Sequence, residues 1–365
     1  MADVPPPLWG EMRDHRRATS RDIADKVGLS VSAVSQTLNG KDIRLSQENK
    51  LLIRATAKRM NYQASFVAGS LATHRSYAYG LVVPDIENPF FSALAKALEE
   101  KSRESVNILV ILNSNDCPGI DVDLFNMLAG RQVDGVFLIP SNRSGKETGR
   151  ESRNRLITIV EQSTFPVVFI DRVPQASRCD SVSFDNVRGG YLATEQFIRR
   201  GHRRIVCLAN EASESGAGRL KGYIEALSDY DIECRAEYII SCDYLEDEGY
   251  RAGEEVLRLL RTEKDERITA VLSCSDLATL GLLGCLHENG ISVGDKCSVI
   301  SYDNSPMIRF ASPGITSVSQ NVKCLAEQAF ALMETRITRP DSQVTRVVLS
   351  LMIVERESVA VLAGV

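Results

Sequence analysis

Polar side chains follow several apolar segments of strand length within three residues. A carboxylate can accept hydrogen bonds from two adjacent hydroxyl groups, and a serine hydroxyl can both donate and accept. Ligands of open α/β sheets bind beyond the carboxyl ends of parallel strands, which is where these side chains would lie. The residues concerned are Asp85 after 79–83, Asp171 after 167–170, Ser275 and Asp276 after 270–273, and Asp303 after 299–301.

Three further side chains would complete such a site. The ring of Phe90 or Phe91 could stack on a sugar or a base. Arg219 could bind a hydroxyl pair or a carboxylate through its guanidinium group. These residue types predict a site for a small, polar, ring-containing molecule.

Several polar residues of the same region also have a purely structural interpretation. Turns and helix N-termini favour Asp and Asn, and a buried Arg often pairs with Asp. The alternatives are a loop at Asn88-Pro89, a turn at Asp134, a helix cap at Asp185-Asn186 and an ion pair at Asp171-Arg172.

Residue patterns typical of enzymes and metal sites are absent from the sequence. The four histidines lie far apart, and Gly216-Ala217-Gly218 is too short to cradle a phosphate. The nine cysteines are scattered singly, as in proteins with reduced cytosolic thiols. No apolar stretch is long enough for a membrane span, and the first residues show no export signal. We therefore expect a cytoplasmic sensor that is no enzyme and has no cofactor and no metal.

The elements that must position these residues alternate between strands and helices. Near-continuous apolar runs predict strands that a parallel sheet buries on both faces, among them 79–83, 108–112, 135–139 and 167–170. Amphipathic segments of helix length separate them. The pattern restarts after Val173-Pro174-Gln175 with 181–184, which predicts two doubly wound lobes and a ligand cleft between them.

The charge of the chain is distributed unevenly. Residues 1–75 hold twelve Lys or Arg and seven Asp or Glu, whereas the whole chain has a net charge of −5. A small basic segment on a large acidic body suggests a module that binds a polyanion.

The basic segment also has the pattern of a helix-turn-helix. Segment 20–27 carries an apolar stripe and ends at Gly28, segment 31–38 follows, and a third helix is expected from Ser46 to about Met60. The residues of the second helix that point away from Val34 and Leu38 would enter the major groove, unless they form an ordinary solvated face. These outward residues are Val31, Ser32, Ser35 and Gln36.

Motifs along most of the chain resemble the LacI/GalR family of transcription regulators. They occur in the order of the family and cover roughly residues 18–360. The matching segments are 18–24, 27–35, Leu38-Asn39-Gly40, 45–48, Asn61-Tyr62, Ser70-Leu71, 80–91, 133–135, 184–186, Arg219 with Gly222-Tyr223, and 301–304.

The resemblance implies an all-α helix-turn-helix head joined to a two-lobed, periplasmic-binding-protein-like α/β body with doubly wound parallel sheets. The expected domains are a flexible extension (1–17), the DNA-binding head (18–62), a hinge helix with linker (63–76) and an effector-binding and dimerisation body (77–365). Within the body, lobe 1 is expected at about 77–174 and 316–338, and lobe 2 at about 175–314 and 342–365.

The resemblance also assigns residues to two sites. In the family, paired hinge helices of a dimer insert a leucine into the minor groove and kink the operator. The expected DNA-binding residues are Ser20, Val31, Ser32, Ser35, Gln36, Asn39, Asn61, Tyr62 and Leu71. The expected effector-binding residues are Asp85, Phe90, Phe91, Asp171, Ser213, Ser215, Arg219, Ser275 and Asp303.

The sequence departs from the family pattern at several of these positions. Gln36 stands where most members have Arg, which removes an arginine–guanine contact and shifts operator preference. Ala64 replaces a proline and Gly69 a basic residue, and Gly69 alone costs about 1 kcal/mol of helix propensity. At the cleft, Ser275 stands where an Asn is usual. We expect a conditional hinge and an effector that no relative identifies.

Three classes of function fit these observations to different degrees. A repressor that binds a pseudo-palindromic operator as a homodimer, under control of a sugar or sugar derivative, uses both the head and the cleft. A cytosolic small-molecule-binding module with weak or vestigial DNA binding leaves the intact head unexplained, and an enzyme lacks a catalytic constellation. Residues 359–365 show no heptad pattern for a tetramerisation tail. Residues 1–17 are either a basic arm or a mis-assigned start before Met12.

Overall fold

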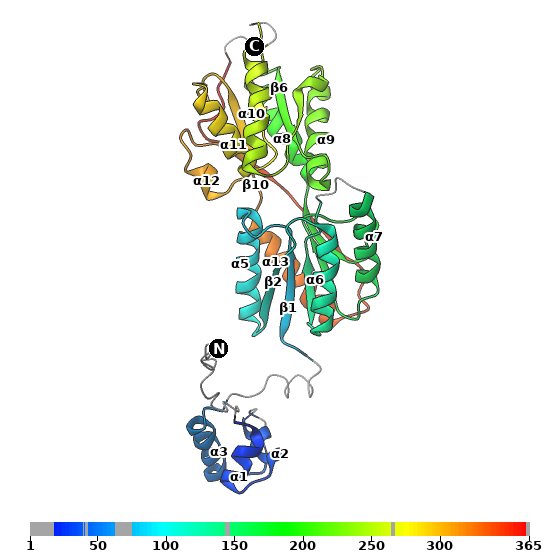
Figure 1. The fold of residues 1–365 in the computed structure, drawn as a ribbon, viewed down its shortest axis with the longest axis vertical. Helices are drawn as coiled ribbons and strands as arrows, with labels where there is room; N and C mark the ends of the chain where they lie inside the picture. The colour runs from blue at the N-terminus through cyan, green and yellow to red at the C-terminus, as the bar shows by residue number, and fades with distance from the viewer. Residues whose placement is uncertain are drawn as a thin grey trace, which may run out of the picture. The chain divides into compact units, whose positions relative to one another are not determined.

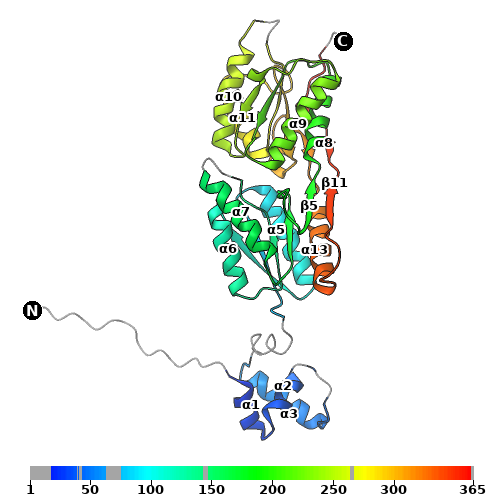
Figure 2. The same cartoon turned by 90° about the vertical axis from the view of Figure 1, so that its right-hand side faces the viewer.

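A computed structural model describes residues 18–38, 40, 43–62, 75–142, 147–263 and 267–362. The chain divides into two compact units, Met1–Ser76 and Tyr77–Val365, named the head and the body below. Figure 1 shows the helical head and the α/β body, and Figure 2 shows them after a quarter turn. The expected fold class, a helix-turn-helix head with a two-lobed parallel-sheet body, is confirmed.

The head contains three helices within its described residues, with bounds close to those expected: α1 (Ser20–Val27), α2 (Val31–Leu38) and α3 (Gln47–Arg59). Local chemistry fixes the ends of α1. Thr19 and Asp22 form a reciprocal capping box at its start, which satisfies two free backbone N–H groups. Gly28 ends it with φ of 68°, a left-handed conformation that glycine adopts without steric cost.

Five apolar side chains form the core of the head. Ile23, Val34 and Ile53 come from α1, α2 and α3 respectively and are fully buried, and Ala24 and Ala57 pack beside them. Burial of each large side chain stabilises the head by about 1.5–3 kcal/mol. A core this small leaves the head dependent on every one of its members.

The body contains two six-stranded sheets within its described residues. In the first sheet all pairs are parallel, in the order β11 (Arg346–Leu349), β5 (Asp180–Phe184), β4 (Val167–Ile170), β3 (Gly135–Leu138), β1 (Ala78–Val83) and β2 (Ile108–Asn113). In the second, only the β10–β12 pair is antiparallel, in the order β12 (Met352–Val354), β10 (Thr316–Ser319), β9 (Ser298–Asp303), β8 (Ala270–Leu272), β6 (Ile205–Ala209) and β7 (Ile239–Ser241).

Helices cover both faces of each sheet, so the central strands are buried on both sides. Those of lobe 1 are α5 (Pro89–Glu104) packed on α13 (Val322–Thr338), and α6 (Pro118–Gly130) packed on α7 (Glu147–Glu161). Those of lobe 2 are α8 (Asn186–Arg199) packed on α9 (Glu214–Asp229), and α10 (Glu246–Leu260) packed on α11 (Asp276–Glu288), with short elements η1 (Ala236–Tyr238) and α12 (Pro306–Arg309).

The expected limits of the two lobes are wrong at three strands. β5 and β11 belong to the first sheet, where they pair in parallel and lie side by side in Figure 2, and β10 belongs to the second. The chain therefore does not cross to lobe 2 near 173–175. It crosses after β5, β10 and β11. The strands of both sheets share the same apolar composition, so the pattern identifies a strand without identifying its sheet.

The segment 108–112 is also not the buried strand that its apolar run predicts. β2 is an edge strand of the first sheet, and the side chains of Ile108 and Ile111 are 64% and 40% exposed. An edge strand has a neighbour on one side only, and here the exposed residues are apolar.

Two glycines of α11 give a matched test of packing between α10 and α11. A Cβ atom on Gly281 would lie 1.8 Å from the Glu246 carbonyl oxygen and 2.6 Å from the Tyr250 amide nitrogen. A Cβ atom on Gly284 would lie 3.9 Å from the nearest atom, in the Tyr250 ring. Gly281→Ala is expected to lower the free energy of unfolding of the body by about 3 kcal/mol. Gly284→Ala is expected to raise it by up to about 1 kcal/mol through helix propensity. Urea unfolding of both variants checks this, and equal midpoints would contradict the close packing.

Candidate functional site

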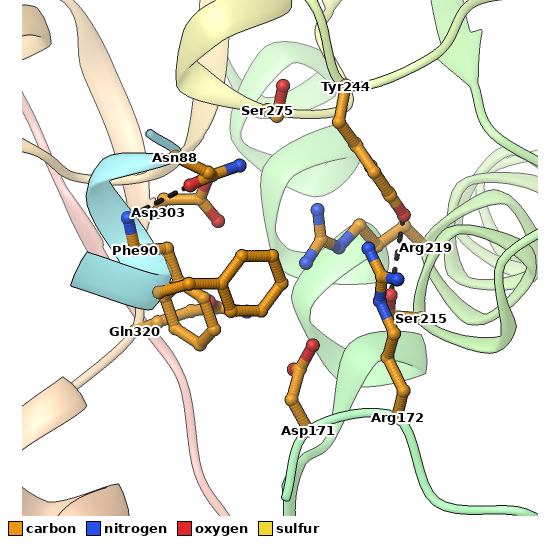
Figure 3. A pocket seen from close by; sticks show the side chains of 11 residues that line it. Asn88, Phe90, Asp171, Arg172, Ser215, Arg219, Tyr244, Ser275, Asp303 and Gln320 are labelled. Carbon is orange, nitrogen blue, oxygen red and sulfur yellow. Dashed lines mark hydrogen bonds between the residues drawn. The ribbon is translucent and has the colours of Figure 1, made fainter. Parts of the chain in front are cut away.

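A cavity lies in the cleft of the body, at the carboxyl ends of strands from both sheets (Figure 3). Seven of the nine expected effector-binding residues line it: Phe90, Phe91, Asp171, Ser215, Arg219, Ser275 and Asp303. Asn88, Arg172, Tyr244 and Gln320 line it as well, and sequence reasoning did not assign them to the site. We call this cavity the inner compartment.

Arg219 occupies the lobe 2 side of the inner compartment. Its Nε donates to Asn186 Oδ1 at 3.0 Å, and its Nη1 donates to the Cys274 carbonyl oxygen. The guanidinium lies 3.6 Å from the centroid of the Tyr302 ring, which supports it by a cation–π contact. These contacts hold a buried cation in one orientation before any ligand arrives.

Arg219 lies inside helix α9, not at its start. Helix α9 begins five residues earlier, with Ser213 as its N-cap and Gly216 and Gly218 in its first turns. A Cβ atom on Gly216 would lie 2.0 Å from the Asn210 carbonyl oxygen. Glycine is needed there because the helix packs closely against that backbone. The glycines are therefore packing residues inside the helix.

Two carboxylates face this guanidinium from strand ends. Asp171 follows β4 and Asp303 ends β9, with left-handed φ values of 61° and 102°. Each such conformation of a non-glycine residue costs about 1–3 kcal/mol, and strain of this kind concentrates at functional sites. Burial raises the pKa of both carboxyl groups, while the charge of Arg219 opposes that shift.

Three buried polar atoms around the inner compartment have no hydrogen-bond partner among the described residues: Asp171 Oδ1, Arg172 Nε and Gln320 Nε2. The three side chains are 8%, 4% and 5% exposed. A buried polar group without a partner costs about 1–3 kcal/mol. A ligand that donates to the carboxylate and accepts from the two nitrogen atoms would remove this cost.

Arg172 and Tyr244 face each other from the two lobes. Arg172 follows β4 of the first sheet, and Tyr244 follows β7 of the second, with the guanidinium 5.9 Å from the ring centroid. The ion pair of Arg172 is with Asp116 Oδ1 at 2.6 Å, so the alternative of an Asp171–Arg172 ion pair is wrong. The Tyr244 hydroxyl donates to Ser213 Oγ at 2.9 Å.

The remaining structural alternatives have different outcomes. Asp185 caps α8 by accepting from the Arg188 amide, and Asp134 accepts from the Tyr77 amide. Asn88 caps α5 and also lines the inner compartment, so both interpretations of this residue apply. Ser213 lies outside the lining of the compartment, where it orients Tyr244 and Ser215.

The inner compartment is narrow in this conformation. Its cavity volume is about 20 Å³. That is room for about one water molecule. A ring-sized ligand would fit there only after the two lobes separate.

Some of the expected DNA-binding residues are exposed on the head. Val31, Ser32 and Gln36 are exposed on α2, and Gln36 Nε2 donates to Ser32 Oγ at 3.2 Å. Ser35 is half-buried on the same helix. Ser20 and Tyr62 hydrogen-bond through their hydroxyl groups at 2.8 Å, and Asn61 is exposed beside Tyr62. Asn39 and Leu71 lie outside the described residues.

The described residues hold no cluster of metal ligands and no membrane-spanning helix. No three His, Cys, Asp or Glu side chains of this part of the chain gather in a way that could hold a metal ion. Within the same residues, no helix has the length and apolar character needed to cross a membrane.

Comparison of the sequence with known proteins finds regulators of transcription. Residues 194–359 match the model of the periplasmic binding protein-like domain. The chain is 31% identical to the HTH-type transcriptional repressor PurR of Mannheimia succiniciproducens over 347 residues, 95% of this chain and 100% of the relative. It is likewise 31% identical to the PurR repressor of Pectobacterium carotovorum, with 94% and 97% covered.

Solved structures agree with this result. The regulator CelR in complex with cellobiose has a TM-score of 0.68 and 27% identity, and covers 94% of this chain and 100% of its own. A LacI family regulator from Enterococcus faecium with bound ribose has a TM-score of 0.67 and 27% identity over 78% of this chain and 99% of its own. The Lac repressor dimer, bound to operator and the anti-inducer ONPF, shares the fold with a TM-score of 0.79 at 21% identity, covering 94% and 100%.

Proposed function

Because the chain belongs to the LacI/GalR family of transcription regulators, and is thus a DNA-binding repressor under small-molecule control, we propose its mode of action. It binds a pseudo-palindromic operator as a homodimer. A sugar or sugar derivative in the cleft of the body controls that binding. The chain performs no catalysis and acts in the cytoplasm, where the operator is.

The unpartnered polar atoms of the inner compartment carry the effector part of the proposal. Asp171 Oδ1 needs a donor, and Arg172 Nε and Gln320 Nε2 need acceptors. A hydroxyl group is both donor and acceptor, so one polyhydroxylated ring can satisfy all three. Phe90 and Phe91, which touch edge to face with centroids 5.2 Å apart, offer an apolar surface for the ring. The cellobiose and ribose named for two solved relatives support this ligand class.

Four residues on the outward side of α2 carry the DNA part of the proposal. Val31, Ser32, Ser35 and Gln36 read base edges in the major groove, with Gln36 favouring adenine. Ser20, Asn39, Asn61 and Tyr62 contact the operator around this helix. Leu71, in the hinge expected at 63–76, acts as the wedge in the minor groove of the operator.

The edge strand β2 carries the dimer part of the proposal. Val106, Ile108 and Ile111 are 77%, 64% and 40% exposed. An apolar edge of this kind is an aggregation hazard unless another chain covers it. We assign it to the interface with the second copy, which sets the spacing of the two heads.

Footprinting with full-length protein and a Leu71→Ala variant tests the proposed function. The wild type is expected to protect a pseudo-palindromic site of about two helical turns near its own gene. Leu71→Ala is expected to abolish this protection and to spare salt-sensitive binding to random DNA, because the wedge acts only in the kinked operator. Absence of any protected site at low salt would overturn the repressor proposal, and an intact footprint of Leu71→Ala would overturn the hinge.

A further inference from the structure

A second cavity adjoins the inner compartment on the outer side of Tyr244. The two share Asn88, Phe91, Arg172 and Tyr244 as lining residues. The second cavity has a volume of about 210 Å³, against about 20 Å³ for the first. We call it the outer compartment. Because the two share a wall of four side chains, they are parts of one cleft. Two of the shared residues, Arg172 and Tyr244, are labelled in Figure 3.

The outer compartment is lined by acceptors whose second oxygen atom is free. Asp85 Oδ1 accepts from the Glu87 amide at 3.0 Å, and Asp243 Oδ1 accepts from the Tyr244 amide at 2.8 Å. Asp116 Oδ1 accepts from Arg172 at 2.6 Å. In all three carboxylates, Oδ2 accepts no hydrogen bond from a described residue. The side chains are thus held in place while one oxygen of each remains open to a donor.

The charge of this lining excludes one class of ligand. Asp85, Glu87, Asp116 and Asp243 line this compartment with one cationic side chain, Arg172, which is already paired with Asp116. An anionic group such as a phosphate would meet several like charges, which costs several kcal/mol of affinity. A group rich in hydroxyl donors meets free acceptors instead. Arg172 lines both compartments, so its unpartnered Nε can donate to a hydroxyl of either part of a ligand.

We propose that the effector has two parts, a ring in the inner compartment and an uncharged, polyhydroxylated second group in the outer one. This chemistry is that of a glycoside, either a disaccharide or a nucleoside. The second group donates to the free carboxylate oxygens of Asp85, Asp116 and Asp243. The inference rests on the proposed small-molecule control and adds that a single ring, or a ring with a phosphate, is not the effector.

Calorimetric titration of the full-length protein with matched probes tests this inference. The disaccharide series consists of glucose, cellobiose and cellobiose 6-phosphate. The nucleoside series consists of adenine, adenosine and adenosine 5′-monophosphate. In one of the two series, the uncharged two-part compound is expected to bind at least tenfold more tightly than its single ring and its phosphate.

Two variants test whether Asp243 provides the tighter binding of the two-part compound. Asp243→Asn keeps Oδ1 and replaces the free oxygen with an N–H donor. We expect it to weaken binding of the two-part compound about tenfold and to leave the affinity for the single ring unchanged. Glu225→Gln, on the exposed face of α9, is the matched control and is expected to change neither affinity.

The outcomes separate this inference from the proposed function. A single ring that binds as tightly as its glycoside, or unchanged binding of the two-part compound by Asp243→Asn, overturns the two-part effector and leaves sugar control standing. Tightest binding of a phosphorylated probe overturns it as well. If no probe binds, both the two-part effector and sugar control are wrong, while footprinting of the same preparation still decides the repressor function.

Discussion

Replacement of Arg219 by alanine is expected to make operator binding insensitive to the effector. Arg219 is 8% exposed, and its guanidinium is fixed by Asn186 and Cys274 and faces Asp171 and Asp303 across the inner compartment. Loss of charge-assisted hydrogen bonds to a ligand costs about 3 kcal/mol, so effector affinity should fall more than a hundredfold. Operator affinity without effector should stay within a few-fold of wild type, because the head does not contain Arg219.

The test compares Arg219→Ala with Arg258→Ala by calorimetry and by operator titration. Arg258 lies exposed on α10 and pairs with Glu255 within the same helix, a contact worth less than about 1 kcal/mol. Arg219→Lys tests the hydrogen bonds to the ligand without loss of the buried positive charge, because lysine lacks the planar set of N–H donors of arginine. Wild-type effector affinity in a folded Arg219→Ala or Arg219→Lys protein would contradict the assigned site.

Replacement of Ile53 by alanine is expected to abolish operator binding while the body continues to bind effector. Ile53 is fully buried in the core of the head, together with Ile23 and Val34. Truncation of a buried isoleucine costs about 2–5 kcal/mol, which is a large part of the stability of so small a unit.

The matched control lies on the same helix. Leu51 of α3 is 64% exposed, so Leu51→Ala should leave the stability of the head nearly unchanged. Operator titration, with the effector affinity of the body measured in parallel, checks both variants. Loss of effector binding in Ile53→Ala would show that the two units do not fold separately. Wild-type operator binding would show that the head does not depend on this core.

Local chemistry explains why the elements of the head and most helices of the body were predictable. Gly28 can end α1 in a left-handed conformation, and the hydroxyl oxygen of Ser46 caps α3, so both ends are encoded within a few residues. The assignment of strands to sheets was not encoded in this way. β5 and β10 have ordinary strand composition, and only long-range pairing decides which sheet each joins.

The same distinction applies to the site. Asp171, Arg219 and Asp303 were predictable because strand ends and family motifs mark them. Tyr244 and Gln320 were missed, because β7 is a strand of three residues and β10 had been assigned to the other lobe. A polar residue after every strand, however short, was the available signal for both. The ion-pair partner of Arg172 was not predictable from neighbouring residues, because its ion pair with Asp116 joins segments 56 residues apart.

Effector binding in the cleft and operator binding by the protein are coupled in this mechanism. Coupling is reciprocal, so the factor by which effector changes operator affinity must equal the factor by which operator changes effector affinity. The decisive measurement is the effector dissociation constant of the wild-type protein, free and saturated with operator. We predict that the two constants differ at least fivefold and that the ratio matches the change in operator affinity. Equal constants, with effector bound in both states, would contradict the account.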